Sequence, residues 1–417
     1  MSVSLDGGDT WKGAQTPNAR VATDIPWLAW TEESYMTTSD LAFDPLQPDR
    51  IWFAQGIGFW SADLVGAPDQ VTFTSQSRGI EQLVANQVIS PPGGKPIAAA
   101  WDRPLFRIDD PDVFPATHGP DREQSIQMGW AVDWATSDPT FLVAVINWQS
   151  EKTGYSTDGG VTWQPFATHP PFFTSGKLRG GIAASSPQNI VWAPSDNGRP
   201  HSTQDGGQSW QECVFPGLPA GDESGFGWAR WFNRHIVAAD RVEPGTFYIY
   251  NYLKGVYRSQ DGAASWQLVK EGELGSFTGY NARLRAVPGQ AGHLFFTGGH
   301  QGGDPNDPVP AADIPLFRST DGGTTWQPIA GTREIYDVSF GEPFAGGAYP
   351  SIYVVGTVNG VYGVHRSDDE GATWKQVGQW PLGSLDIVTG VTGDLNQAGR
   401  VYVSFGGSGF AYGDTAP

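Results

Sequence analysis

The chain has 417 residues and a formal net charge of −19, with its 44 acidic residues spread along the sequence. Because no Lys/Arg run could neutralise phosphates, nucleic acid is set aside as a partner, and an anionic polymer is a poor ligand for the same electrostatic reason. The single cysteine, Cys213, excludes an intramolecular disulfide, and no apolar run is long enough to span a membrane. No cofactor and no metal site are expected.

The composition indicates an ordered, turn-rich chain. Gly (55) and Pro (32) exceed average usage, which is also true of disordered chains, but 13% of the residues are aromatic. Disordered chains contain few aromatics, whereas the 18 tryptophans here need a packed environment. The N-terminus lacks the basic and apolar segments of a signal peptide, so the sequence itself does not fix the compartment.

An eight-residue pattern, Ser/Thr-x-Asp-x-Gly-x-Ser/Thr-Trp, occurs six times. The copies begin at Ser4, Ser156, Thr203, Ser259, Ser319 and Ser367, and Ala263 replaces the glycine once. The Asp side chain is expected to accept backbone N–H bonds across a tight turn in which Gly supplies a positive φ. The Trp is expected to pack between sheets. These boxes are therefore predicted to build hairpins, and their aspartates and tryptophans are predicted to be structural.

In chain order, the first box hairpin is followed by two segments without boxes, 40–60 and 83–108, that alternate as strands do. Further inner strands are predicted at 129–135, 180–186, 235–242, 282–288 and 334–340. The last segment, 386–414, has strands and no box. We expect an all-β fold, a single β-propeller spanning 1–417 with four-stranded antiparallel blades, eight in number with seven as the alternative. Residues 1–13 are predicted to pair with 386–414 and close the ring, which would hide edge strands.

Longer strings resemble glycoside hydrolase family 74, the xyloglucanases and related endo-β-1,4-glucanases. They are DIPWL (24–28), SDLAFDPLQPDRIWF (39–53), RGIEQLVANQVISPPGGKP (78–96), FRIDD (106–110), PSIYVVGTVNGVYGVHRSDDEGATW (350–374) and TGDLNQAGRVYVSFGGSGFAYGD (392–414). The family has two tandem propellers with the active cleft between them, and this chain resembles the second propeller alone. The stretch that holds the family's first catalytic aspartate has no counterpart here. The resemblance favours an extracellular location.

The resemblance implies an inverting hydrolase that uses two carboxylates about 6.5–9.5 Å apart. Asp40 lies where the family's second catalytic aspartate is expected, and Asp133 and Asp240 are outside candidates that are better explained as turn or solvated residues. Sugar rings stack on aromatic side chains, so eight residues outside the boxes are substrate-binding candidates. They are Trp27, Trp30, Tyr35, Trp130, Trp134, Trp148, Trp228 and Trp231.

Three functions stay open at this point. The first is a propeller that binds, and as an enzyme hydrolyses, a neutral β-glucan such as xyloglucan. The second is a non-catalytic glycan-binding propeller within a larger assembly. The third is a protein-binding propeller, for which a polar face without an aromatic strip is expected. The sequence leaves open whether the chain is an enzyme and whether it associates with itself or with another protein.

Overall fold

The computed structural model describes residues 2–13, 19–30, 38–56, 58–64, 71–101, 103–119, 128–147, 150–171, 180–194, 198–218, 235–251, 254–274, 282–298, 315–344, 346–379 and 388–417. Their regular structure is almost entirely β, as predicted, with one short helix, α1 (Pro26–Trp30), and one 3₁₀ turn, η2 (Ser150–Lys152). Within these ranges no helix has the length and apolar character needed to cross a membrane.

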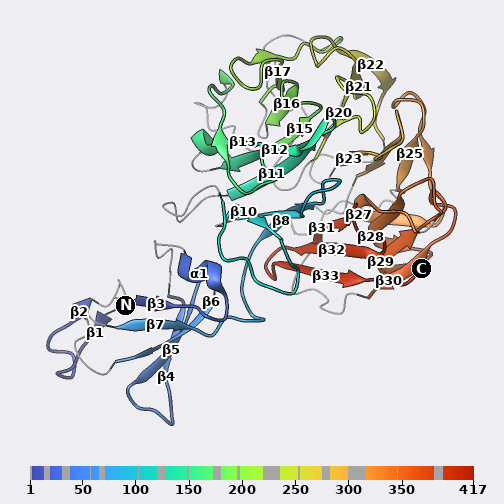
Figure 1. Cartoon of the computed structure of the whole chain (residues 1–417). Coiled ribbons are helices and arrows are strands. Elements are labelled where there is room, and N and C mark those ends of the chain that lie inside the picture. The colour runs from blue at the N-terminus through green and yellow to red at the C-terminus, as the bar shows by residue number, and fades with distance from the viewer. Residues whose placement is uncertain are drawn as a thin grey trace.

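Seven antiparallel sheets follow one another around a ring (Figure 1), and the innermost strand of each contacts the innermost strand of the next. Each sheet is given from its inner strand outward. The first consists of β8 (Ala85–Ile89), β9 (Ile97–Ala100) and β10 (Leu105–Arg107), and the second of β11 (Met128–Ala135), β12 (Asp138–Asn147), β13 (Gly154–Ser156) and β14 (Gln164–Pro165). The third consists of β15 (Gly180–Ala184), β16 (Ile190–Pro194), β17 (His201–Thr203) and β18 (Gln211–Glu212), and the fourth of β19 (Val237–Ala239), β20 (Phe247–Asn251), β21 (Gly255–Ser259) and β22 (Gln267–Glu271).

The remaining three sheets complete the ring. They are β23 (Arg283–Ala286), β24 (Leu294–Thr297), β25 (Phe317–Ser319) and β26 (Gln327–Pro328); β27 (Thr332–Gly341), β28 (Ser351–Val358), β29 (Val361–Ser367) and β30 (Lys375–Gly378); and β31 (Val388–Gly393), β32 (Arg400–Phe405) and β33 (Phe410–Asp414). The five inner strands predicted between 129 and 340 are confirmed as β11, β15, β19, β23 and β27. Buried aliphatic and aromatic residues fill the space between neighbouring sheets, which is how a propeller forms its core.

The N-terminal residues form a lobe beside the ring (Figure 1). Its five-stranded sheet consists, in spatial order, of β3 (Ala19–Val21), β7 (Thr72–Ser75), β6 (Gly58–Asp63), β5 (Arg50–Gln55) and β4 (Asp40–Phe43), and a separate hairpin pairs β1 (Ser2–Val3) with β2 (Lys12–Gly13). Helix α1 lies on the side of the lobe that faces the ring. The described residues thus form eight sheets of three or more strands, seven in the ring and one in the lobe, which is consistent with a count of either seven or eight blades.

Ring closure differs from the expectation that 1–13 would pair with 386–414. Strands β1 and β2 pair with each other, while the N–H of Leu83 donates to the carbonyl of Gly407 at 3.0 Å. The hydroxyl groups of Thr389 and Thr392 donate to backbone carbonyls of β8 at 2.6 Å each. Because the segment that leads into β8 already occupies the contact with the last sheet, the ring closes through residues 83–94 and not through the N-terminal hairpin.

The box hairpins have the predicted hydrogen bonds. In the second box, the N–H of Thr162 donates to Asp158 Oδ1 at 2.9 Å and the N–H of Gly160 donates to Ser156 Oγ at 2.8 Å. Equivalent bonds occur in the other five boxes. Ala263 adopts the same left-handed conformation with a φ of 67° and still donates to Ser259 Oγ, so the hydrogen bonds outweigh the strain of a Cβ there.

The prediction that all six box tryptophans are core residues is wrong for the first of them. Trp266 is buried and Trp163, Trp210, Trp326 and Trp374 are half-buried, whereas Trp11 is 65% exposed. Among the described strands, β1 and β2 are hydrogen-bonded only to each other, so this box is not part of a four-stranded blade as the other five are.

Candidate functional site

Asp40 begins β4, which is the edge strand of the N-terminal lobe. All four residues of β4 are exposed, and Asp40 lies opposite Ala54 of β5. Within the described chain its carboxylate accepts one hydrogen bond, from the backbone N–H of Leu41 at 2.8 Å. The carboxylate is therefore held in orientation by its own strand and faces solvent, where a substrate or another polypeptide can reach it.

The neighbouring Asp44 has a structural position. It accepts N–H bonds from Leu46 and Gln47 and the indole N–H of Trp52 at 2.9 Å, so it fixes the turn between β4 and β5. The hydrogen bond from Trp52 is the largest cause that lowers the pKa of the Asp44 carboxyl. Asp44 thus supports the strand on which Asp40 lies.

Two of the predicted sugar-stacking residues lie in the core. Trp27 is 2% exposed and packs edge-on against Phe106, with 5.3 Å between ring centroids. Trp130 is also 2% exposed and stacks on Trp101 at 5.8 Å. An indole with both faces covered cannot stack on a sugar, so in this structure these two rings act in packing.

The other aromatic candidates are placed differently. Trp134 lies at the end of β11 and lines a cavity at the centre of the ring. Trp30 belongs to α1, of which only the backbone is described at that position. Tyr35, Trp148, Trp228 and Trp231 lie outside the described residues.

A cavity lies at the junction of the lobe and the ring. Its volume is about 160 Å³, and its apolar wall includes Trp27, Phe106 and Phe410. Glu81 and Asp112 contribute carboxylates to the lining. Aromatic walls with a few polar groups are typical of sites for neutral sugars, and Phe410 is half-buried, which leaves part of its ring available for contact. We call this space the junction cavity.

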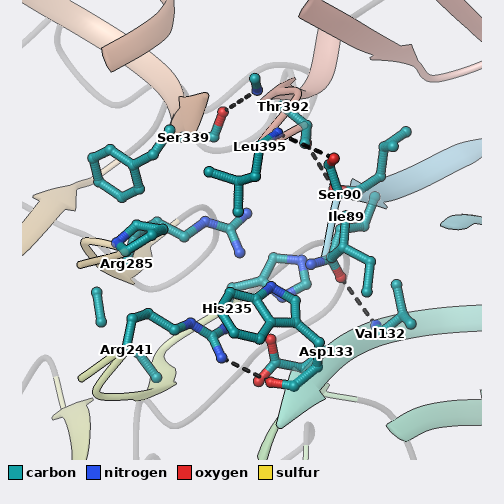
Figure 2. A pocket seen from close by; sticks show the side chains of 18 of the residues that line it. Ile89, Ser90, Val132, Asp133, His235, Arg241, Arg285, Ser339, Thr392 and Leu395 are labelled. Atoms are coloured by element: carbon teal, nitrogen blue, oxygen red, sulfur yellow. Dashed lines mark hydrogen bonds and ion pairs between the residues drawn. The ribbon is translucent and has the colours of Figure 1, made fainter. Parts of the chain in front are cut away.

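A second cavity of about 90 Å³, the inner cavity, lies where the inner strands surround the ring axis. Side chains from β8, β11, β23, β27 and β31 line it, together with residues that flank β19. Figure 2 shows Arg241, Arg285 and His235 pointing toward its middle. A cationic lining is unexpected in a chain with a net charge of −19.

Asp133 and Arg241 form a buried ion pair on one side of the inner cavity, with Arg241 Nη2 2.5 Å from Asp133 Oδ1. Asp133 Oδ2 also accepts the N–H of Ala184 at 3.0 Å, and the Arg241 Nη1 group donates to the carbonyl of Trp134 at 2.8 Å. Asp133 therefore joins three successive blades. This corrects the expectation of a turn or solvated residue.

Asp240, the other outside candidate, is buried and accepts four hydrogen bonds. The backbone N–H groups of Val242 and Glu243 donate to Oδ1, and Tyr248 and the N–H of Gly292 donate to Oδ2. It is a turn residue, as expected, but it is enclosed and not solvated.

On the opposite side, Asp337 is shared by two arginines of β23. Arg285 Nη2 lies 3.2 Å from both oxygens of Asp337, and Arg283 Nε lies 3.6 Å from Oδ1. Burial is the largest influence on Arg283 and lowers the pKa of its guanidinium to about 10; Asp337 opposes this shift and Arg285 adds to it. Burial, then Arg285 and Arg283, hold the pKa of the His235 imidazole well below its usual range.

Sequence reasoning identified the strands that carry these groups and missed the groups themselves. Arg283, Arg285 and Asp337 lie within strands that were predicted to be inner strands, and His235 and Arg241 flank β19. A usable signal was present, because a charged residue in the innermost strand of a propeller has only the ring axis or a neighbouring blade to face. In the described part of the chain, no group of three or more His, Cys, Asp or Glu residues could hold a metal ion.

Comparisons with known proteins agree with this architecture. The family model described as BNR/Asp-box repeat matches residues 155–165 and 317–328. The xyloglucanase Xgh74A of Acetivibrio thermocellus is 30% identical over 99% of this chain and 48% of its own length, and a Paenibacillus xyloglucanase is 28% identical over 99% of the chain and 40% of its own length. The chain spans about half the length of these curated relatives.

Solved structures give the same result. The GH74 xyloglucanase of Xanthomonas campestris is 28% identical with a TM-score of 0.76, over 100% of this chain and 55% of that one. The GH74 enzyme of Niastella koreensis, at 24% identity, shares the fold with a TM-score of 0.74 over 97% and 53% of the two chains. The chain is therefore an Asp-box β-propeller protein related to the xyloglucanases of glycoside hydrolase family 74.

Proposed function

We propose that the chain recognises a neutral, xyloglucan-type β-glucan and supplies one half of a xyloglucanase active site. The observation that carries the proposal is the 30% identity to a xyloglucanase over 99% of the chain. The acidic chain repels anionic polymers and leaves a neutral glycan favoured. The junction cavity offers the half-buried ring of Phe410 for sugar faces and two carboxylates for hydroxyl groups.

Asp40 is proposed as one of two catalytic carboxylates. In inversion, one carboxylic acid protonates the leaving glycosidic oxygen while a carboxylate removes a proton from the water that attacks the anomeric carbon from the opposite face. The exposed edge position of Asp40 lets a glycan approach it. The second carboxylate is proposed to come from a polypeptide that covers the lobe, because the chain spans about half of its relatives.

Incubation of the chain with xyloglucan, in the presence of the partner polypeptide that supplies the second carboxylate, followed by measurement of new reducing ends and of bound polysaccharide, tests this proposal. Asp40→Asn is expected to reduce release by about 10²–10⁴-fold and to leave binding unchanged, because the amide cannot exchange a proton. Asp49→Asn is the matched control, since Asp49 is an exposed turn residue of the same lobe. If both variants release reducing ends at the same rate, Asp40 is not a catalytic residue. If the chain neither binds xyloglucan nor releases reducing ends, the proposal is refuted.

A second candidate is a non-catalytic propeller within a larger assembly. The N-terminal lobe exposes large apolar side chains, among them Leu5 (72%), Trp11 (65%), Phe43 (63%) and Leu46 (89%). Such groups mark protein-contact surfaces when they gather on one element. Xyloglucan binding without release of reducing ends, by the chain in the presence of its natural partner, would favour this candidate over the enzyme.

A further inference from the structure

The inner cavity holds more guanidinium groups than its carboxylates can neutralise. Arg241 has Asp133 as its partner, whereas Arg283 and Arg285 share Asp337. Asp337 also accepts the N–H groups of Val338 and Val391, so its lone pairs are divided among Arg285 and two backbone donors, and Arg283 is held only as an ion pair. A buried positive charge without its own counter-charge is costly and favours a bound anion.

Several donors around Asp337 have no acceptor. Arg283 Nε and Nη1 and Arg285 Nε are buried and donate no hydrogen bond to any acceptor within the described chain. The Arg283 side chain is only 3% exposed, while that of Arg285 is 20% exposed and lines the cavity. Arg285 is therefore the cation that an incoming ligand can reach.

His235 is the second group that points to a ligand. The residue is 95% buried, as its exposure of 5% indicates, and its imidazole lines the inner cavity (Figure 2). Its backbone carbonyl accepts the N–H of Leu284 at 2.8 Å, which fixes the residue beside β23. No hydrogen bond joins the imidazole to any other residue that the structure describes. An imidazole N–H is thus free to donate into the cavity.

Two neutral donors complete the lining. Ser339 Oγ accepts the N–H of Gly393 at 2.8 Å, which leaves its hydroxyl proton for the cavity, and the Gln87 side-chain oxygen accepts the N–H of Val132 at 3.0 Å, which leaves its amide NH₂. Farther out, the Asp394 carboxylate accepts hydrogen bonds from the hydroxyl groups of Ser90 and Tyr402 and from the N–H of Asn396. The groups that remain free around the cavity are donors, and an oxyanion is the ligand class that accepts from several donors at once.

We propose that the inner cavity binds a small oxyanion, a carboxylate or a phosphate, held by Arg285 and His235 with Ser339 and Gln87 as further donors. The volume of about 90 Å³ suits an ion of this size and not a sugar chain. The site is independent of glycan recognition, since it lies on the ring axis and contains neither Asp40 nor the junction cavity. The bound anion supplies further negative charge to balance the guanidinium groups, which Asp337 alone cannot balance.

Protonation of His235 is linked to this binding. The imidazole shares the cavity lining with Arg285 of β23, Asp133 of β11 and Arg241 after β19, and the charges of Arg285 and Arg283 act on it. Burial and the two β23 arginines disfavour its proton in the absence of a ligand. A bound anion places negative charge beside the imidazole and favours its protonated form. Binding is therefore expected to be accompanied by uptake of a proton and to strengthen as the pH falls from 7 to 5.5.

Titration calorimetry of the whole chain with sodium phosphate and with sodium acetate, at constant ionic strength adjusted with sodium chloride, tests the proposal. Arg285→Gln is expected to weaken binding by about tenfold or more, because a charge-assisted hydrogen bond is lost. Arg50→Gln, which removes an arginine from the exposed pair with Asp63, is the matched control and should bind as the parent chain does. Preference for phosphate or for acetate distinguishes the two anion classes.

Thermal unfolding separates a ligand site from a purely structural charge cluster. Arg285→Gln leaves Arg283 with Asp337 as a one-to-one pair, so in anion-free buffer its midpoint should equal or exceed that of the parent chain, and added anion should no longer raise it. His235→Gln should retain the fold and lose proton uptake, measured as equal binding enthalpies in buffers of different ionisation enthalpy. The proposal would be overturned if added anion raised the unfolding midpoint equally in the parent chain, Arg285→Gln and Arg50→Gln, or changed the midpoint of none of them.

Discussion

The guanidinium group of Arg241 lies over the indole ring of Trp134, with 4.0 Å between Arg241 Cζ and the ring centroid, and the same group pairs with Asp133. Both side chains of the ion pair are about one-tenth exposed. Cation–π contact and ion pair together fix the end of β11 against the loop after β19. The arrangement joins nonadjacent segments of the ring at the inner cavity.

We expect Arg241→Gln to lower the free energy of unfolding by about 3–5 kcal/mol, because it leaves the buried Asp133 carboxylate without its partner. The double variant Arg241→Gln/Asp133→Asn should lose less than the sum of the two single variants. Urea denaturation measures all three. As a control, Arg400→Gln breaks an exposed pair with Asp414 and should cost about 0–1 kcal/mol. Additive losses in the double variant would contradict the coupling.

Acid should destabilise the fold through its buried histidines. Burial first, then Arg103, lowers the pKa of the His118 imidazole to about 3. The unfolded chain takes up this proton near pH 6.5 and the folded chain does not, so stability is complete above pH 6.5 and falls as the pH decreases toward 3. Between pH 6.5 and 5 the loss from His118 is about 2 kcal/mol. Urea midpoints measured across this range should decline less steeply in His118→Gln, and an equal slope would contradict the assignment.

Two phenylalanines on adjacent strands of the N-terminal lobe should respond very differently to substitution. Phe43 of β4 is 63% exposed, whereas Phe53 of β5 is 1% exposed and packs against Phe73. Phe43→Ser is expected to change stability by at most about 0.5 kcal/mol, and Phe53→Ala to cost about 3–5 kcal/mol. Thermal and urea unfolding of both variants measure the difference. A large loss from Phe43→Ser would show that β4 is covered in solution.

Cys213 should report on opening of the ring. The thiol is buried, and burial raises its pKa to about 12 despite opposing hydrogen bonds from Ser202 and Trp266. Because the thiolate is the reactive form, the folded chain should react with a disulfide reagent at pH 8 far more slowly than the urea-unfolded chain. Fast labelling of the folded chain would contradict the packing of Cys213 between sheets, and its rate in urea should follow the unfolding transition.

The boxes could be predicted in detail because their hydrogen bonds join residues that lie at most four positions apart in the sequence, as between Asp158 and Thr162. The ring closure could not, since Leu83 precedes the first blade of the ring in the sequence and Gly407 lies in the last. Which segment contacts the last sheet depends on the number of blades and on the rotation from each blade to the next. A short sequence pattern does not contain this information.

The positions of Trp130 and Trp134 show a second limit of local patterns. Strict alternation would place both rings on one face of β11, because they are four residues apart. A bulge between Gly129 and Ala131 shifts the register, so Trp130 packs with Ala131 between the β11 and β15 sheets while Trp134 lies with Val132 on the other face. The charged cluster was missed because its contacts are also non-local. Asp133 and Arg241 form an ion pair although they are 108 residues apart in the sequence and belong to different blades.

Binding of xyloglucan to the whole chain tests the central claim most directly. Native electrophoresis through gels that contain xyloglucan should retard the chain in proportion to the polysaccharide concentration, and Phe410→Ala should weaken the retardation because Phe410 lines the junction cavity. Phe43→Ser serves as the control for a general loss of apolar contact. Mobility that is unchanged by xyloglucan would contradict glycan recognition and restrict the relationship with xyloglucanases to the fold.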